Sequence, residues 1–241
     1  MDFQKHLEEV TQRVKAMAGP IQSQKFSQAI EYWEGVKGEY PGLKAREYRI
    51  PDDYARCSFD NFKGDDRLVS RLKRYKGGNV ILSGNTGVGK THLAIAMLRH
   101  TEEKEWNDLC QEYIDTLKAG VEITKRGKNS KCFLKVPELL LEIRDSFNHN
   151  SDISEMELLD CYSYKSFLIL DDLGSEKITD FSISTLSLLI DRRDGNSRNT
   201  IITTNMTLAE IDEKLNARIA SRLSRWINVK IDMPDYRKTR N

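Results

Sequence analysis

Apolar residues recur at helical spacing through the first part of the chain. Those from Phe3 to Met17 return every three or four positions, which predicts an amphipathic helix that Gly19 and Pro20 end. A second helical stretch passes through Trp33 and ends before Pro41. Residues 1–50 are therefore expected to form a small helical unit. A unit of this size is marginal on its own, so it is either a docking module for a partner or a helical cover on the main domain.

The pattern changes after about residue 54. Short apolar runs that read as strands now alternate with helical stretches, which is typical of a parallel sheet covered by helices on both faces. We therefore expect residues 54–241 to form one three-layer α/β domain. The predicted strands are Asn79–Ser83, Cys132–Val136, Phe167–Asp171, Thr200–Thr204 and Ile227–Ile231.

The composition fits one substantial domain with a small appendage. The chain has 241 residues, of which 39% are hydrophobic and 31% charged, and this is enough apolar material for a buried core. No apolar run approaches the roughly 20 residues that cross a bilayer, and the charged N-terminus is unlike a signal peptide. We therefore expect a cytoplasmic protein with no membrane partner.

Charge and cysteine content argue against two further classes. The 38 lysines and arginines nearly balance the 37 acidic residues, so the chain is not a uniformly basic nucleic-acid coat. Two local basic runs stand out, at Lys118–Lys135 and Arg218–Arg240. The four cysteines lie far apart and have no histidine nearby, whereas zinc ligands come in close pairs.

A glycine-rich loop follows the first predicted strand. Residues Gly84 to Thr91 satisfy the pattern G-x-x-x-x-G-K-[ST], and a helix-forming stretch continues from His92. Glycines let backbone N–H groups wrap a phosphate closely, and the helix N-terminus adds partial positive charge. Lys90 can reach the β- and γ-phosphates, and the Thr91 hydroxyl can ligate Mg²⁺. The segment predicts a nucleotide-binding site.

Polar side chains end the two central apolar strands. Asp171 and Asp172 close one of them, and Thr204 and Asn205 close the next. Ligands bind at the carboxyl ends of strands in open α/β sheets, so these groups are expected to face the phosphates. Asp171 suits the metal, and Asp172 suits polarising the attacking water. The Asn205 amide can hydrogen-bond both that water and the γ-phosphate.

The remaining pattern favours an ATPase. The strand at Cys132–Val136 lies between the phosphate loop and the acidic strand, an addition that the ATPase branch of P-loop folds carries. Asp171 to Gly174 matches the GTPase pattern D-x-x-G, but no N-K-x-D occurs to read guanine. Further along, Arg218 and Arg222 share a helix face. They either supply a guanidinium to a neighbouring subunit's γ-phosphate or are the solvated face of an ordinary amphipathic helix.

The order of these motifs resembles that of a known family. The chain is similar to the AAA+ replicative-helicase loaders of bacteria and their phages (DnaC/DnaI-like), and closely similar IstB-type transposition ATPases share much of the pattern. The resemblance covers roughly Tyr54 to Arg237, about three quarters of the chain. The segments that carry it are GNTGVGKT, FLILDDLGSEK, TIITTN, ARIASRL and the closing DYR, and YARCSFDNFKG precedes them.

The resemblance implies an ASCE/AAA+ domain that lacks a full C-terminal lid, and it implies ATP and Mg²⁺ as ligands. Asp171 and Asp172 would form Walker B, with Thr91 and Asp171 on the metal and Asp172 in the catalytic role. Asn205 would be the first sensor, Arg222 the arginine finger that acts in trans, and Arg218 a second candidate for it. The nucleotide-binding residues would be Gly84, Asn85, Thr86, Gly87, Val88, Gly89, Lys90, Thr91, His92 and, as a second sensor, Arg237.

The partners that the resemblance implies are a replicative helicase hexamer, single-stranded DNA and further copies of the chain, which would associate through the ATP site. Arg144 and Phe147 stand at the end of a predicted helix and offer a cation and an aromatic ring to single-stranded DNA. Phe147 would equally suit the core. The stretch from about 103 to 130 is longer than the usual link between the phosphate loop and the next strand, and the resemblance gives it no role.

Two alternatives stay open beside a loader that hydrolyses ATP. An IstB-type transposition helper would bind duplex DNA and a transposase. A nucleotide-dependent interaction switch would bind ATP without measurable turnover. Many AAA+ proteins have Asp-Glu where this chain has Asp171 and Asp172. The shorter second acid implies slow or switch-like hydrolysis.

Overall fold

The computed structural model describes residues 23–118, 130–146, 153–195 and 198–236, which fall into two compact units. Of the described residues, the larger unit comprises 45–98, 130–146, 153–195 and 198–236. The smaller comprises 23–44 and 99–118. Helix α4 (Lys90–Lys118) therefore contributes its first turns to the larger unit and the rest to the smaller.

The larger unit is built on a five-stranded parallel sheet in the order β2-β3-β4-β1-β5. Every predicted strand is confirmed to within two residues. The central strands are buried on both faces, as the continuous apolar runs predict. The strands are β1 (Asn79–Gly84), β2 (Lys131–Lys135), β3 (Phe167–Leu173), β4 (Asn199–Thr204) and β5 (Ile227–Ile231).

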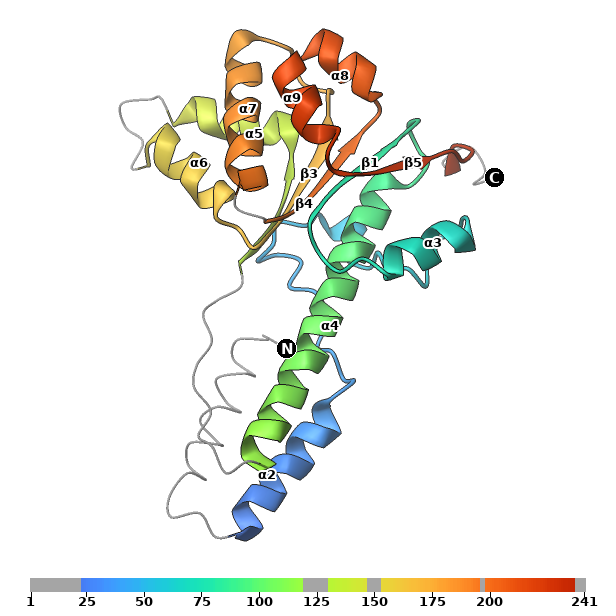
Figure 1. Ribbon diagram of the computed structural model, residues 1–241, viewed down its shortest axis with the longest axis vertical. Coiled ribbons are helices and arrows are strands. Elements are labelled where there is room, and N and C mark those ends of the chain that lie inside the picture. The colour runs from blue at the N-terminus through green and yellow to red at the C-terminus, as the bar shows by residue number, and fades with distance from the viewer. Residues whose placement is uncertain (1–22, 119–129, 147–152, 196–197, 237–241) are drawn as a thin grey trace. The chain divides into compact units, whose positions relative to one another are not determined.

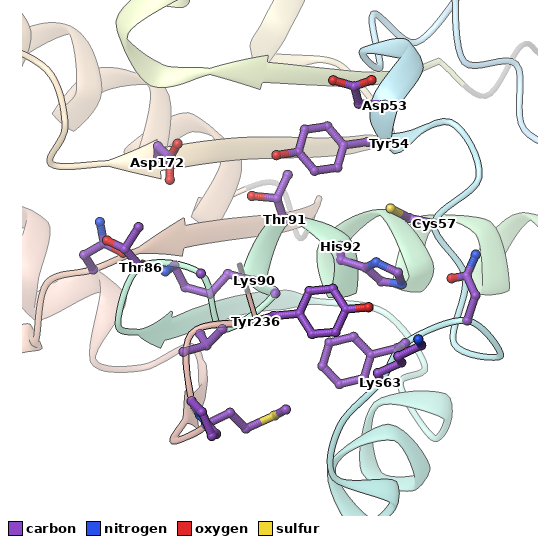
Figure 2. A pocket seen from close by; sticks show the side chains of 18 of the residues that line it. Asp53, Tyr54, Cys57, Lys63, Thr86, Lys90, Thr91, His92, Asp172 and Tyr236 are labelled. Carbon is purple, nitrogen blue, oxygen red and sulfur yellow. Dashed lines mark hydrogen bonds between the residues drawn. The ribbon is translucent and has the colours of Figure 1, made fainter. Parts of the chain in front are cut away.

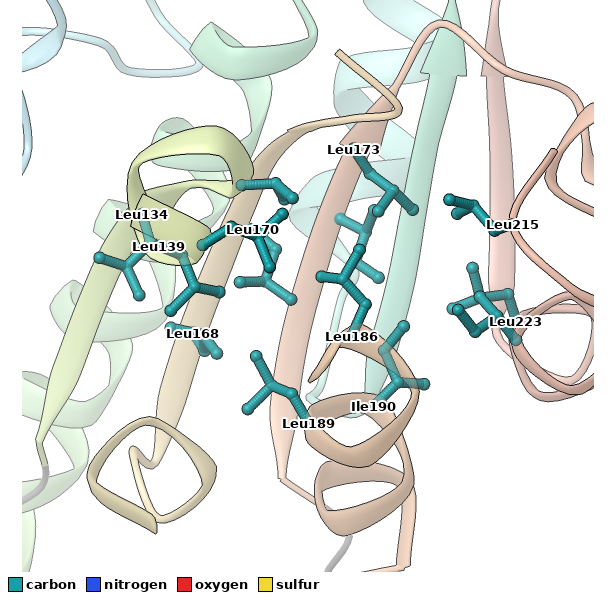
Figure 3. Close-up of a cluster of buried hydrophobic side chains, with 14 of the residues drawn as sticks. Leu134, Leu139, Leu168, Leu170, Leu173, Leu186, Leu189, Ile190, Leu215 and Leu223 are labelled. Carbon is teal, nitrogen blue, oxygen red and sulfur yellow. The ribbon is translucent and has the colours of Figure 1, made fainter. Parts of the chain in front are cut away.

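Helices cover both faces of this sheet, which confirms the three-layer α/β prediction (Figure 1). The start of α4 lies on one face, and α5 to α9 lie on the other. On that second face Leu134, Leu168 and Leu170 of the sheet pack against Leu139 and Leu189 of the helices (Figure 3). The remaining helices of the unit are η1 (Asp52–Tyr54), α3 (Asp66–Lys73), α5 (Val136–Asp145), α6 (Glu155–Ser163), α7 (Asp180–Gly195), α8 (Leu208–Lys214) and α9 (Ala217–Leu223).

Helix boundaries follow local capping chemistry. The side chain of Ser154 accepts a hydrogen bond from the Glu157 backbone, and Glu157 bonds back, which forms a capping box at the start of α6. Thr207 and Glu210 repeat the arrangement at the start of α8. These caps satisfy backbone N–H groups that a helix start would otherwise leave unpaired. They fix the first residues of α6, which precedes β3 in the chain, and of α8, which follows β4.

Helix α2 (Ser23–Val36) and the later part of α4 form the apolar core of the smaller unit. Trp33 stacks on Tyr113 with ring centroids 4.5 Å apart, and the indole of Trp106 donates to the backbone oxygen of Val36 at 3.1 Å. The first part of the long link, to which the sequence assigns no role, is thus one of two core helices. The predicted helix between Phe3 and Met17 lies outside the described residues, and the predicted boundary at 50–54 stays a prediction.

No helix among the described residues is long and apolar enough to span a membrane.

A buried arginine of α7 forms hydrogen bonds with the end of α6 and with the start of β4. Arg193 of α7 has an exposed fraction of 0%. Its guanidinium donates to the backbone oxygens of Tyr162, Ser163, Lys165 and Asn199 at 2.7 to 3.1 Å, and to the Thr200 hydroxyl at 2.9 Å. Burial lowers its pKa to about 9, which still leaves it charged at pH 7.

We expect Arg193→Ala to reduce the free energy of unfolding by about 3 kcal/mol or more, because several buried carbonyl groups would lose their donor. The neighbouring Arg192→Ala is the matched control. Arg192 forms a partly exposed ion pair with Asp160 at 2.7 Å, and such pairs contribute about 1 kcal/mol or less. Urea unfolding of both variants measures the difference. Equal losses in the two variants would contradict the structural role given to Arg193.

Candidate nucleotide-binding site

The loop between β1 and α4 needs glycine at two positions. Gly87 and Gly89 have φ angles of +82° and +88°, in the left-handed region that side chains disfavour. A Cβ at Gly87 would lie 1.8 Å from Oδ1 of Asp235, and one at Gly89 would lie 2.7 Å from the ring of Phe62. The loop therefore passes closely between Asp235 and Phe62, and a side chain at either glycine would collide with one of them.

Lys90 lies at the mouth of this loop, at the first position of α4. The residue is 6% exposed, and Nζ donates to the backbone oxygens of Gly84 and Asn85 at 3.0 and 2.8 Å. Nζ also donates to Oδ1 of Asn205 at 2.6 Å. The structure thus brings the predicted phosphate-binding lysine and the predicted sensor amide into direct contact, although 115 positions separate them in the chain.

A buried carboxylate joins three elements at the end of the sheet. Asp171 is 2% exposed and accepts hydrogen bonds from the hydroxyls of Thr91 at 2.8 Å and Thr203 at 2.7 Å. Burial, the largest cause, raises the pKa of Asp171 to about 6, and the charge of Asp172 adds to the rise. The hydrogen bonds from Thr203 and Thr91 oppose it. Asp171 and Thr91 are therefore held together, as a shared metal site would need.

Asp172 points elsewhere because the strand is irregular there. Its φ angle is +60°, which aspartate tolerates better than most residues. The β3–β4 register shifts between Leu170 and Leu173, and the backbone N–H of Asp172 donates to the Thr203 hydroxyl at 2.9 Å. A bulge of this kind re-aims a side chain. Asp171 stays buried, and Asp172 lines the cavity beside the loop.

The cavity has a volume of about 670 Å³, within the usual size range of small-molecule sites (Figure 2). Its lining includes predicted residues from three elements: Thr86 to His92, Asp172 and Asn205. Sequence reasoning missed the opposite wall. The residues of that wall include Asp53, Tyr54, Arg56, Cys57, Asn61, Phe62, Lys63, Met233 and Tyr236. The segment YARCSFDNFKG resembles the corresponding segment of the helicase loaders, and this was the one sign of the wall in the sequence. The resemblance does not indicate that the segment packs over the phosphate loop.

His92 connects the two walls of the cavity. Its Nε2 lies 2.9 Å from the backbone oxygen of Ser58, and its ring centroid lies 5.3 Å from that of Phe62. Burial lowers the pKa of His92, against a smaller opposing effect of the Ser58 bond. The neutral ring thus packs the segment before the domain core onto the start of α4.

The candidate arginines of α9 do not line the cavity of their own chain. Arg218 and Arg222 both form ion pairs with Asp191 of α7. The side chain of Arg218 is 66% exposed and that of Arg222 28%. Their predicted role in trans stays a prediction.

The other predicted contacts are only partly described. Arg144 is exposed near the end of α5, whereas Phe147 and Arg237 lie outside the described residues. Tyr236, the neighbour of Arg237, lines the cavity, and its N–H donates to the Gly87 oxygen at 3.0 Å.

The donor set around Thr91 and Asp171 fits Mg²⁺, which prefers hard oxygen ligands. In the described part of the chain no three histidine, cysteine or acidic side chains form a metal cage. Mg²⁺ rarely needs such a cage, because it keeps several waters and is shared with substrate phosphates. The Thr91 hydroxyl and the Asp171 carboxylate would be the protein's ligands in such an arrangement.

The sheet order, the glycine cradle and the acidic strand end together define an AAA+ P-loop domain. No family model matches the chain, but solved structures of this class do. A crystal structure of the DnaC helicase loader superposes with a TM-score of 0.54 at 23% identity, over 76% of this chain and 100% of that one. The replication initiator DnaA bound to AMPPCP and single-stranded DNA gives 0.56 at 16% identity, over 76% and 51%.

Curated relatives point to one group within that class. The replicative helicase loader DnaC of Escherichia coli K12 is 28% identical over 185 residues, which are 71% of this chain and 66% of that protein. DnaC of Buchnera aphidicola from Baizongia pistaciae is 26% identical over 203 residues, or 78% and 72%. The chain is thus similar to DnaC helicase loaders over 71% to 78% of its length, and the resemblance seen in its motifs is confirmed.

Thr203 offers a test of the site that the sequence alone does not suggest. We expect Thr203→Val to weaken the effect of Mg²⁺ on nucleotide affinity about tenfold, because a hydrogen bond to a charged group contributes about 1.5–3 kcal/mol. Titration of a fluorescent ADP analogue with and without Mg²⁺ measures this effect.

Thr200→Val is the matched control for Thr203→Val. Thr200 lies on the same strand, is equally buried and accepts a hydrogen bond from Arg193 instead. Both variants should lose about 1–3 kcal/mol of unfolding free energy, but only Thr203→Val should alter the Mg²⁺ effect. An unchanged Mg²⁺ effect in Thr203→Val would show that Asp171 does not need this hydroxyl to serve the metal.

Proposed function

We propose that this protein is an ATP-binding and ATP-hydrolysing replication protein that loads a replicative helicase onto single-stranded DNA. The observation that carries the proposal is the match to DnaC helicase loaders over 185 residues. The match includes most of this chain but only 66% of the E. coli protein, so the activity and partners of the relative are transferred here as a proposal. The cavity supports the nucleotide chemistry, and the relatives support the partner.

ATP would bind with its phosphates on the loop from Gly84 to Thr91. Lys90 is already held at the mouth of the loop by backbone oxygens and Asn205, so it is placed to meet the β- and γ-phosphates without a large rearrangement. Mg²⁺ held by Thr91 and Asp171 would neutralise charge on those phosphates. The wall around Phe62 and His92 would enclose the remainder of the nucleotide.

Hydrolysis would need a water aligned with the γ-phosphate. Asp172 enters the cavity from the irregular end of β3 and is the group we assign to polarise that water. Asn205 contacts Lys90, so an amide that senses the γ-phosphate would be coupled to the lysine that binds it. The short side chain of Asp172 supports slow turnover, which suits a protein that grips and releases partners.

A second subunit would complete the site. Arg222, or Arg218 beside it, would enter a neighbour's cavity and stabilise the charge that develops on the γ-phosphate. Neither arginine lines the cavity of its own chain, so a contribution in cis is not available from this arrangement. Assembly of several copies on a helicase and on DNA would then be tied to ATP.

We expect light scattering of the protein with the host's replicative helicase hexamer, ATP and Mg²⁺ to detect a stable complex that contains several copies of the protein. Lys90→Ala should abolish ATP-dependent assembly, because the phosphates lose their principal cation. Lys214→Ala, which removes an exposed lysine paired with Glu210, should assemble as the wild type does. Failure of the wild type to form a complex would sink the loader assignment, and a complex with a transposase instead would favour the transposition helper.

The trans-acting arginine predicts recovery of activity on mixing. Lys90→Ala and Arg222→Ala should each hydrolyse ATP poorly alone. Mixed together, they should recover a measurable fraction of the wild-type rate, because an intact Arg222 on one subunit can meet an intact Lys90 site on another. No recovery, with both variants still folded, would argue that Arg222 acts within its own chain or not at all. The same mixture made with Arg218→Ala decides between the two arginines.

A further inference from the structure

A run of exposed cations covers α3 and the turns on either side of it. We call Lys63, Arg67, Arg71, Arg74 and Lys76 the α3 basic surface. All five are exposed, and none forms an ion pair with any residue in the described part of the chain. Residues 63–76 hold six cations and two acids. The sixth cation, Lys73, is paired with Asp60.

Five arginines elsewhere on the larger unit form ion pairs with acidic residues. Arg49 pairs with Glu142, and Arg192 pairs with Asp160. On α9 and just after it, Arg218, Arg222 and Arg225 are held by Asp191 and Asp194 of α7. The α3 basic surface therefore carries positive charge that the fold does not offset, whereas the basic run of the α9 region is matched by acids.

The spacing of these cations gives the surface a direction. Arg67, Arg71 and Arg74 follow one another at intervals of four and three residues, so they lie in a row along one side of α3. Residues that are four positions apart in a helix are separated by about 6 Å along the helix axis. Arginine binds phosphate through paired N–H groups. A row of this kind fits a chain of regularly spaced phosphates better than it fits a single anion.

The row continues onto the open edge of the sheet. Strand β5 is an edge strand, and Arg71 donates to the backbone oxygen of Asn228 on it at 3.4 Å. Lys230 of β5 is also exposed. Tyr75 is the only aromatic residue between 63 and 76, and its hydroxyl donates to the Gly78 oxygen at 2.6 Å, which holds the ring half-buried. The surface thus offers charge and hydrogen-bond donors but no base-stacking platform.

The α3 basic surface shares residues with the nucleotide cavity. Lys63 belongs to the lining of that cavity, and Phe62 beside it lies against Gly89 and His92. A Cβ at Gly64 would lie 2.5 Å from the side chain of Met233, another lining residue. The segment that closes over the nucleotide therefore leads directly into α3.

We propose that the α3 basic surface binds the phosphate backbone of single-stranded DNA, independently of sequence. The choice of single-stranded DNA as the source of phosphates rests on the proposed function. The charge, its row-like arrangement and its lack of acidic partners stand without it. This contact is distinct from the one predicted at Arg144 and Phe147, because Arg144 lies on α5, which follows the edge strand β2, whereas Arg71 contacts β5 at the opposite edge of the sheet (Figure 1).

The test is fluorescence anisotropy of a labelled oligothymidylate with the full chain over a series of salt concentrations. The variant Arg67→Gln/Arg71→Gln/Arg74→Gln removes three charges and keeps good helix formers. The matched control, Arg192→Gln/Lys214→Gln/Arg225→Gln, also removes three charges, each from a cation with an acidic partner. Circular dichroism melting checks that both variants fold.

The α3 variant should lose affinity about tenfold or more near physiological salt, and the slope of log affinity against log salt should become shallower by about 2, because each single-strand phosphate contact contributes about 0.7. The control should stay close to wild type. Binding of a fluorescent ATP analogue should be unchanged in both variants, since none of the six residues lines the cavity.

Three results would overturn the proposal: equal losses in the α3 variant and the control, an unchanged salt slope in the α3 variant, or a wild type that binds no single strand. Tighter binding of the matched duplex would overturn the choice of single-stranded DNA. The helicase complex is measured separately by light scattering. Loss of that complex with DNA binding intact counts against the loader proposal alone, and the reverse counts against the α3 basic surface alone.

Discussion

The hydroxyl of Thr203 links β4 to both acidic residues at the carboxyl end of β3. It donates to the buried carboxylate of Asp171 and accepts from the N–H of Asp172, so one atom of β4 satisfies one acid and fixes the left-handed backbone of the next. Burial of Asp171 is costly, as its raised pKa shows, and the donors from Thr203 and Thr91 offset that cost. The Thr203 hydroxyl thus contacts both acids, of which Asp171 is buried and Asp172 lines the cavity.

Much of the fold can be predicted from the sequence because its determinants are local. Strands β1, β2 and β3 each contain an uninterrupted apolar run, and the phosphate loop is a contiguous pattern of glycines before a helix. The meeting of Asp172 and Asn205 at the loop follows from the rule that parallel strands end at one edge. Thr203 could not be singled out, because a threonine inside a strand of β-branched residues looks like ordinary strand composition.

Other features depend on contacts between distant parts of the chain. The segment from Tyr54 to Lys63 forms a cavity wall because His92 and Phe62 pack it onto α4. The spacing of apolar residues in the sequence does not predict that packing. Helix α4 continues without a break past Arg99, yet its residues before and after that point belong to different compact units. A continuous helical pattern in the sequence does not predict this division, because the division depends on which residues each part of the helix packs against.

The number of basic residues in a stretch of sequence is a poor guide to whether that stretch binds a polyanion. The run from Arg218 to Arg240 attracts attention in the sequence, but α7 places Asp191 and Asp194 against three of its arginines. The shorter run at α3 contains two acids of its own, and one of them, Asp65, is engaged in capping the helix. Its remaining cations face solvent beside an edge strand, where unpaired positive charge also discourages pairing with a second sheet. A polyanion responds to the charge that folding leaves uncompensated, and the α3 row has no acidic partner among the described residues, whereas Arg218, Arg222 and Arg225 each have one. That difference arises from ion pairs between residues about thirty positions apart in the chain, which only the folded structure brings together.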